Sequence, residues 1–172
     1  MHGSYNSPIV LKALDLSIAQ SIDLDAGWSW VSFNLENNDL SLDSTLSYLT
    51  PSSDDQFIDF NAGEYSEYSN NYENGSWVGS LLAINNQSMY QIEIAEPDKL
   101  TVIGLEVTVS ENPIPYVSGW NWIAYSPQIS MEIDDALSDA SVVEDEIDLI
   151  KGRFGFAEYV DCLLYTSPSP RD

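Results

Sequence analysis

Aromatic side chains carry the clearest chemical potential in this chain, which has 5 Trp and 10 Tyr among its 172 residues. A flat aromatic ring that is exposed on a surface can pack against the face of a sugar ring. The best candidates for such a platform are Trp77, Tyr65, Tyr68 and Tyr72. The alternative is burial, because large aromatics supply much of the core of a small β unit. Burial is favoured for Trp77 and is expected for the Trp28/Trp30 and Trp120/Trp122 pairs.

Carboxylates are the second group that could do chemistry. Clustered carboxylate oxygens bind Ca²⁺, and a facing pair can serve glycoside hydrolysis. The clustered carboxylates are Asp23 and Asp25, Asp54-Asp55, Asp134-Asp135 and Glu144-Asp145-Glu146. No segment matches the EF-hand loop, and a chain with 28 Asp and Glu offers many accidental pairs. We therefore expect a solvated acidic surface, with no metal site and no cofactor.

Nucleophilic catalysis finds little support, because the chain has one Cys, Cys162, and one His, His2. A disulfide framework needs paired Cys, and a zinc site or a catalytic triad needs His or Cys in the fold. His2 stands at the extreme end of the sequence, and phosphate-binding or GxSxG motifs are missing. The sequence predicts a protein that is not an enzyme.

The charge balance argues against two classes of partner. With 28 acidic and 5 basic residues the formal net charge is −23, while 44% of the residues are hydrophobic, as in an ordinary globular protein. So negative a surface repels nucleic-acid phosphates and anionic lipid headgroups. No apolar run approaches the ~18 residues of a membrane helix, and Met1–Tyr5 do not begin a signal peptide. The chain is either cytosolic or an internal piece of a longer protein.

An internal repeat organises the elements that carry these residues. The segment Gly27-Trp-Ser-Trp-Val-Ser-Phe33 recurs as Gly119-Trp-Asn-Trp-Ile-Ala-Tyr125, 92 positions later. Apolar residues spaced as one helix face, from Leu42 to Leu49, recur 91 positions later from Ile133 to Ala140. Glu67-Tyr68 likewise matches Glu158-Tyr159. Periodic self-similarity of this kind is typical of tandem units.

The repeat predicts the domain organisation. Residues 1–19 end a preceding unit, 20–112 form a complete unit, 113–160 begin a second, and 161–172 form a non-native or disordered tail. The repeat pattern stops after Tyr159, and the ending through Cys162 to Asp172 resembles a translated sequencing-adapter read-through. A real, flexible Ser-Pro tail is the alternative.

The expected fold is mainly β: an antiparallel β-rich module with one short helix in each repeat of about 90 residues. Within 22–35 the apolar phase slips after Trp30, which predicts a bulge or a doubly buried strand near Gly27. A helix is expected over 42–49, with Asp39 or Ser41 as its N-cap. Further strands are expected at 57–60, 65–68, 77–82, 89–94 and 100–109, the last bending at Gly104.

These motifs resemble a known tandem unit. The pattern around Trp28/Trp30, Trp77-Val-Gly79, Met89-Tyr90 and Trp120/Trp122 is similar to the Gly-Trp-Asn-Trp type β-rich repeats of large secreted and cell-surface proteins. Those proteins come from Bacteroidetes and other marine bacteria and are associated with type IX secretion. The resemblance covers roughly residues 10–160 and contributes no catalytic residues.

The resemblance implies an extracellular or cell-surface location and a stalk, scaffold or adhesion role. The expected partners are neighbouring repeat units of the same chain, and the expected state is a monomer. A carbohydrate-binding module attached to a polysaccharide-degrading enzyme is the alternative, with a glycan as its ligand.

Overall fold

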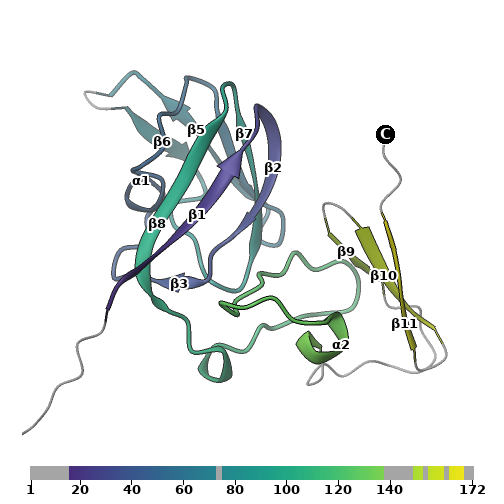
Figure 1. Ribbon diagram of the computed structural model, residues 1–172. Coiled ribbons are helices and arrows are strands. Elements are labelled where there is room, and N and C mark those ends of the chain that lie inside the picture. Colours follow the sequence, from purple (N-terminus) through teal and green to yellow (C-terminus); the bar gives the residue numbers. More distant parts are fainter. Residues whose placement is uncertain (1–15, 73–74, 138–148, 153–154, 161–162, 169–172) are drawn as a thin grey trace, which may run out of the picture. The chain divides into compact units, whose positions relative to one another are not determined.

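The computed structural model describes residues 16–72, 75–137, 149–152, 155–160 and 163–168. It divides into two compact units, the first ending at Ser126 and the second beginning at Pro127. The predicted fold class is confirmed, because antiparallel strands dominate the described chain (Figure 1).

Within its described residues the first unit holds eight strands and two short helical segments. In chain order these are β1 (Ile18–Leu24), β2 (Gly27–Ser32), β3 (Leu35–Glu36), α1 (Leu42–Thr45), β4 (Gln56–Asp59), β5 (Glu64–Ser69), β6 (Ser76–Gly79), β7 (Met89–Ile94), β8 (Asp98–Glu106) and the 3₁₀ turn η1 (Val109–Glu111). The second unit contains α2 (Ile133–Ala136), β9 (Leu149–Lys151), β10 (Gly155–Val160) and β11 (Leu163–Pro168).

Two antiparallel sheets build the first unit around one core. The larger sheet has the order β2-β7-β4-β5-β6, and the smaller has the order β1-β8-β3. Phe57, Tyr90 and Ile92 of the larger sheet belong to the same buried cluster as Leu24 and Leu100 of the smaller one. The alternation of buried and exposed residues along β7 is that of a strand whose one face covers a core.

The chain changes sheet between Leu24 and Gly27. The strand expected over 22–35 divides, because β1 ends at Leu24 and pairs with β8, whereas β2 begins at Gly27 and pairs with β7. Gly27 has φ +91°, a backbone conformation that glycine adopts without a steric penalty. The predicted backbone irregularity at this glycine is therefore a change of sheet. The bulge or doubly buried strand expected from the phase slip is wrong, because β2 pairs with β7 in unbroken register and buries only the face that carries Ser29 and Val31.

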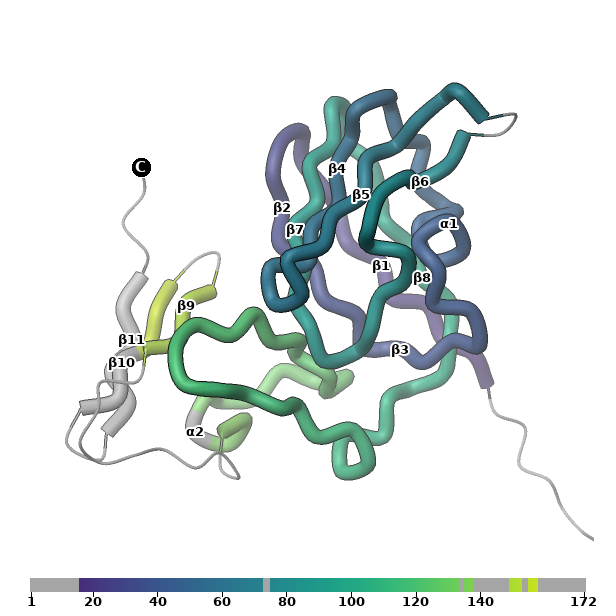
Figure 2. The backbone as a smooth tube through the Cα atoms, turned by 180° about the vertical axis from the view of Figure 1, so that it is seen from behind, coloured from purple at the N-terminus to yellow at the C-terminus, as the bar shows by residue number. Residues whose placement is uncertain are grey.

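The expected helix over 42–49 is shorter than its apolar spacing indicated. α1 ends at Thr45, although Leu42, Leu46 and Leu49 are all buried as the spacing predicted. Ser41 is the N-cap residue without a side-chain cap bond, while Asp39 Oδ1 accepts the Ser41 N–H at 3.0 Å. In Figure 2, which views the unit from behind, α1 lies beside β6.

The second unit repeats local structure of the first. α2 lies 91 positions after α1, and β10 lies 91 positions after β5. β10 is the middle strand between β9 and β11, as β5 is between β4 and β6. Gly119 stands 92 positions after Gly27 and also has a positive φ of +100°, although it belongs to the first compact unit and the described residues that follow it form no strand like β2. The repeat found in the sequence therefore has a counterpart in the backbone.

The predicted boundaries and the compact units do not coincide. The segment 113–126, assigned by sequence to the second repeat, clusters with the first unit. Contacts define a compact unit whereas a sequence period defines a repeat, so the repeat boundaries stay a prediction. The tail expected to be non-native or disordered contains β11, paired with β10. The assignment of 161–172 as a non-native or disordered tail stays a prediction. His2, Ala140, Cys162 and the carboxylates at 144–146 lie outside the described residues.

Candidate functional site

Trp77, the first residue of the predicted sugar platform, lies in the core. Only 8% of its surface is exposed, and its ring meets Phe57 and Tyr68 edge to face at centroid distances of 6.2 and 5.6 Å. The backbone N–H of Trp77 donates to Asp43 Oδ1 at 2.9 Å, and this bond connects β6 to α1. Trp77 therefore offers no ring face to a ligand, and the burial alternative is confirmed for it.

The three Tyr of the predicted platform do not share a surface with it. Tyr65 and Tyr72 are 54% and 55% exposed, whereas Tyr68 is half-buried against Trp77. Tyr65 and Tyr68 stand three positions apart on β5, and side chains alternate across a strand, so they face opposite ways. The structure brings Tyr68 and Trp77 together, and it places Tyr65 on the opposite face of β5.

The core role expected for the Trp-x-Trp pairs is wrong for Trp28 and Trp120. These two rings are 45% and 69% exposed. In β2 the buried residues are Ser29 and Val31, so both Trp of the first pair project from the opposite, outer face of the strand. The aliphatic residues that follow the pair face the core, and the two Trp side chains do not.

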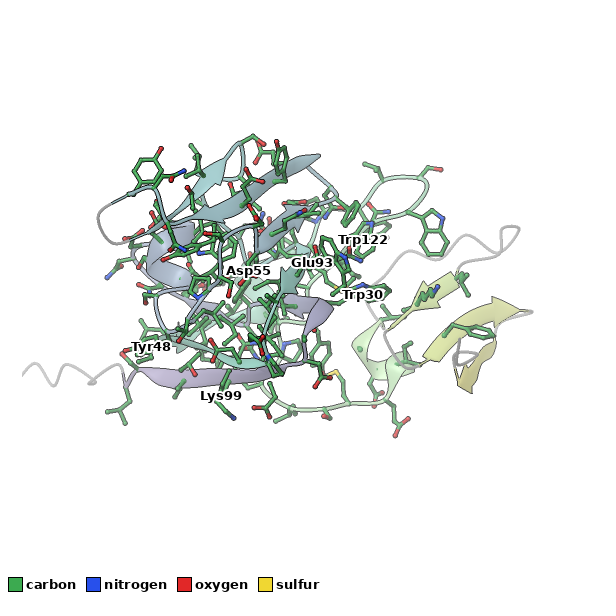
Figure 3. The ribbon with its side chains drawn as sticks, turned by 90° about the horizontal axis from the view of Figure 1, so that it is seen from above. Trp30, Tyr48, Asp55, Glu93, Lys99 and Trp122 are labelled. Atoms are coloured by element: carbon green, nitrogen blue, oxygen red, sulfur yellow. The ribbon has the colours of Figure 1, made fainter. Side chains whose placement is uncertain are left out.

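Trp30 and Trp122 meet at an aromatic cluster on the first unit, which we call the Trp122 seat and define as Trp30, Phe60, Asn61 and Ser88. The Trp122 ring stacks on Phe60 with a centroid distance of 4.7 Å and an interplanar angle of 19°. It meets Trp30 edge to face at 5.2 Å and 72°. Figure 3 shows Trp30 and Trp122 next to one another. The second member of each repeated pair thus packs against the other.

The backbone of Trp122 is held by the side chain of Asn61. The Trp122 N–H donates to Asn61 Oδ1 at 2.9 Å, and Asn61 Nδ2 donates to the Trp122 carbonyl at 2.7 Å. The same carbonyl accepts the Met89 N–H at 2.9 Å. Asn61 lies just beyond β4 and its carboxamide pairs with one residue of an extended chain as a neighbouring strand would.

The residues on either side of Trp122 are bound as well. The Ala124 N–H donates to the Gln87 carbonyl at 3.0 Å, and Ile123 forms an isolated antiparallel bridge with Ser88. The Gln87 side chain donates to the Pro113 carbonyl at 2.8 Å. The segment 113–126 is therefore bound along the loop that precedes β7.

A second surface feature is a polar groove of about 550 Å³ beside α1 and β8. Tyr48, 59% exposed, supplies its aromatic ring, and among the described residues that line it Glu36 is the one that carries a charge. The remaining lining residues carry mostly hydroxyl, amide or aliphatic groups: Ser17, Asn37, Asn38, Ser44, Thr45, Ser47, Thr101, Val102, Ile103, Gly104 and Leu105. Tyr48 and the Trp122 seat are well separated in Figure 3.

Two carboxylates of the predicted acidic clusters make contacts within the fold. Asp55 is buried and accepts the N–H groups of Ser52 and Ala95 at 2.8 and 2.9 Å, while Asp23 pairs with Lys99 at 2.6 Å. Across the described residues no three His, Cys, Asp or Glu side chains gather closely enough to hold a metal ion. In the same part of the chain no helix has the length and apolar character needed to cross a membrane.

Comparison with known proteins adds no relative: no family model, curated protein or solved structure matches the chain. Sequence reasoning missed Asn61 and Phe60, because their role depends on a residue some 60 positions away. Tyr48 was missed for the same reason, since β8 completes its groove. The recurrence of Gly-Trp-x-Trp was the one sequence signal that pointed to the seat.

Proposed function

We propose that this chain is part of a non-enzymatic tandem array of β-rich units and acts as a stalk, scaffold or adhesion element of a larger extracellular or cell-surface protein. Each unit buries its own core and meets its neighbours, as in repeat proteins in general. The resemblance of the Gly-Trp-x-Trp pattern to repeats of secreted proteins supports the extracellular location.

One observation carries this proposal: the backbone recurs with the sequence. The helices α1 and α2, the strands β5 and β10, and the positive-φ residues Gly27 and Gly119 are each 91 or 92 positions apart. Independent domains joined by chance do not share both residue pattern and local conformation at one offset. The recurrence therefore supports a unit that is used more than once.

Small-angle X-ray scattering on tandem chains tests the array function. Residues 20–110 are repeated two, three and four times ahead of residues 111–172, and the maximum dimension of each chain is measured. A stalk or scaffold predicts a monomer whose maximum dimension grows linearly with the number of units. Chains that collapse into globules, or that show no cooperative unfolding, would refute the proposal. Surface labelling of intact cells with an antibody to residues 16–126 tests the location.

Carbohydrate binding is the second candidate function, and the groove beside Tyr48 is the observation that favours it. Its walls are almost free of charge in a chain of net charge −23, and they combine an exposed ring with hydroxyl and amide groups. Neutral glycans offer hydroxyls for such groups and apolar ring faces for Tyr48. Trp77 is buried and therefore does not belong to this candidate binding site.

A neutral-glycan array followed by calorimetry tests this second candidate. Tyr48→Ala is expected to reduce the affinity for any bound glycan at least tenfold. Tyr65→Ala is the matched control, since Tyr65 is 54% exposed on β5 and lies outside the groove. No bound glycan, or a loss confined to Tyr65→Ala, would rule out the groove as the binding site.

A further inference from the structure

We propose that the Trp122 seat is a docking site for an extended Gly-Trp-Asn-Trp-Ile segment, and that it fixes the start of one repeat to the unit before it. The occupant is the chain's own segment 119–125. This inference rests on the proposed tandem array and names the joint within it. Three independent features of the seat support it.

The first feature is that the seat recognises backbone. The Asn61 carboxamide both donates to and accepts from Trp122, and Met89 shares the same carbonyl. The bridge between Ser88 and Ile123 and the bond from Ala124 to Gln87 continue this pairing. A single residue offers its N–H and carbonyl together to one side chain only when the chain is extended. The seat therefore selects an extended segment by its main chain.

The second feature is that the seat distinguishes the two Trp of the motif. Trp122 is half-buried between Phe60 and Trp30, whereas Trp120 is 69% exposed. Aromatic pairs in stacked and edge-to-face geometry stabilise beyond the area that they bury. Only the second Trp makes these pairs, so the two rings provide a matched test and control.

The third feature is that Asn121 prepares the segment for docking. Its side chain accepts the Val117 N–H at 3.0 Å and donates to the carbonyls of Val117 and Gly119 at 2.7 and 2.9 Å. These bonds close a compact loop that leads into Trp122. The position that corresponds to Asn121 is Ser29, a residue of β2 whose side chain is buried on the core face of that strand. The Ser-to-Asn difference thus separates a strand of the sheet from a docking loop.

The seat is specific to this junction. At an offset of 91 the positions of Phe60 and Asn61 are occupied by Lys151 and Gly152, which provide neither the ring nor the carboxamide. A second unit with these residues cannot hold a following Trp in the same way. We expect the joint to define the order of these two repeats and not to recur at every junction.

Amide hydrogen exchange, followed by NMR on the full 172-residue chain, tests the joint. Asn61→Ala removes both side-chain hydrogen bonds to the Trp122 backbone, and Trp122→Ala removes the ring contacts with Phe60 and Trp30. Each variant is expected to speed exchange of the Ala124 amide roughly tenfold, because the segment opens more often. Trp120→Ala is the matched control and should leave this rate unchanged. The Ile92 amide in β7 reports on the whole unit and should keep its protection in all three variants.

The joint is wrong if the Ala124 amide exchanges at the wild-type rate in both Asn61→Ala and Trp122→Ala, or if Trp120→Ala speeds it equally. These results are independent of the scattering test. If the tandem chains are elongated but Ala124 amide exchange is unchanged in the variants, the array is supported and the joint is wrong. Faster exchange as predicted, together with collapsed tandem chains, would support the docking site and overturn the array.

Discussion

Replacing Trp77 with Ala should destabilise the first unit, not remove a binding surface. Trp77 is 8% exposed and fills the space between Phe57 and Tyr68, with both rings edge to face. The loss of a buried Trp side chain costs about 3–5 kcal/mol, because the surrounding residues cannot fully close the cavity. We take a central value of about 4 kcal/mol for the fall in the free energy of unfolding.

The measurement is urea and thermal denaturation followed by circular dichroism, which does not depend on the fluorescence of the residue removed. For a unit of this size about 4 kcal/mol corresponds to a fall in Tm of roughly 15 °C. Trp120→Ala is the matched control, because it removes the same side chain from a position that is 69% exposed. It should change the free energy of unfolding by less than about 0.5 kcal/mol.

A Trp77→Ala variant within about 1 kcal/mol of the wild-type stability would contradict the burial of this ring. It would restore Trp77 as a candidate for the sugar platform. If Trp120→Ala were equally destabilising, the loss could not be attributed to the core packing of Trp77, and the reasoning from burial would fail.

Three further predictions concern backbone packing, pH and salt. Gly79→Ala should lower the free energy of unfolding by about 2 kcal/mol or more in urea denaturation, since a Cβ there would lie 2.2 Å from the Tyr65 carbonyl oxygen; wild-type stability would show that β5 and β6 can separate. Burial, with the charge of Asp59 as a smaller cause, raises the pKa of Tyr90 from 10.0 to about 12. The stability that Tyr90 contributes is therefore complete below pH 10 and is lost as the pH rises toward 12. Absorbance titration should find one late-titrating Tyr that disappears in Tyr90→Phe, and a titration unchanged in that variant would contradict the assignment. Finally, the net charge of −23 predicts that Tm rises between low salt and about half-molar NaCl, as screening weakens self-repulsion; an unchanged Tm would argue against this.

Much of the local structure followed from the sequence pattern. The strands expected at 57–60, 65–68 and 89–94 match β4, β5 and β7 within one residue at each end. In 89–94 the apolar or aromatic residues Tyr90, Ile92 and Ile94 alternate and are buried, so local preference and burial agree. The strands at 57–60 and 65–68 were found from their aromatic residues and from the turn residues that flank them. The helix at 42–49 was too long because its apolar spacing reports which side chains are buried, not how far hydrogen bonding continues.

The roles of the aromatic residues were harder to predict. Trp77 and Trp120 have the same side chain and both stand near Gly residues, yet one is 8% exposed and the other 69%. Tyr65 and Tyr68 stand three positions apart on one strand, and an odd spacing places two side chains on opposite faces. The sequence alone could therefore have excluded a platform that contains both residues. Which of those faces meets the core depends on the second sheet.

The sequence by itself determined that this chain is mainly β, repeats at 91 or 92 positions, and has a backbone irregularity at Gly27. Periodicity, turn chemistry and the conformational freedom of glycine are local properties, so they can be read residue by residue. Only the tertiary structure decided that Trp122 packs between Phe60 and Trp30, and that Asn61 pairs with its backbone. Those contacts join residues some 60 to 90 positions apart, and the path of the intervening strands sets their distance.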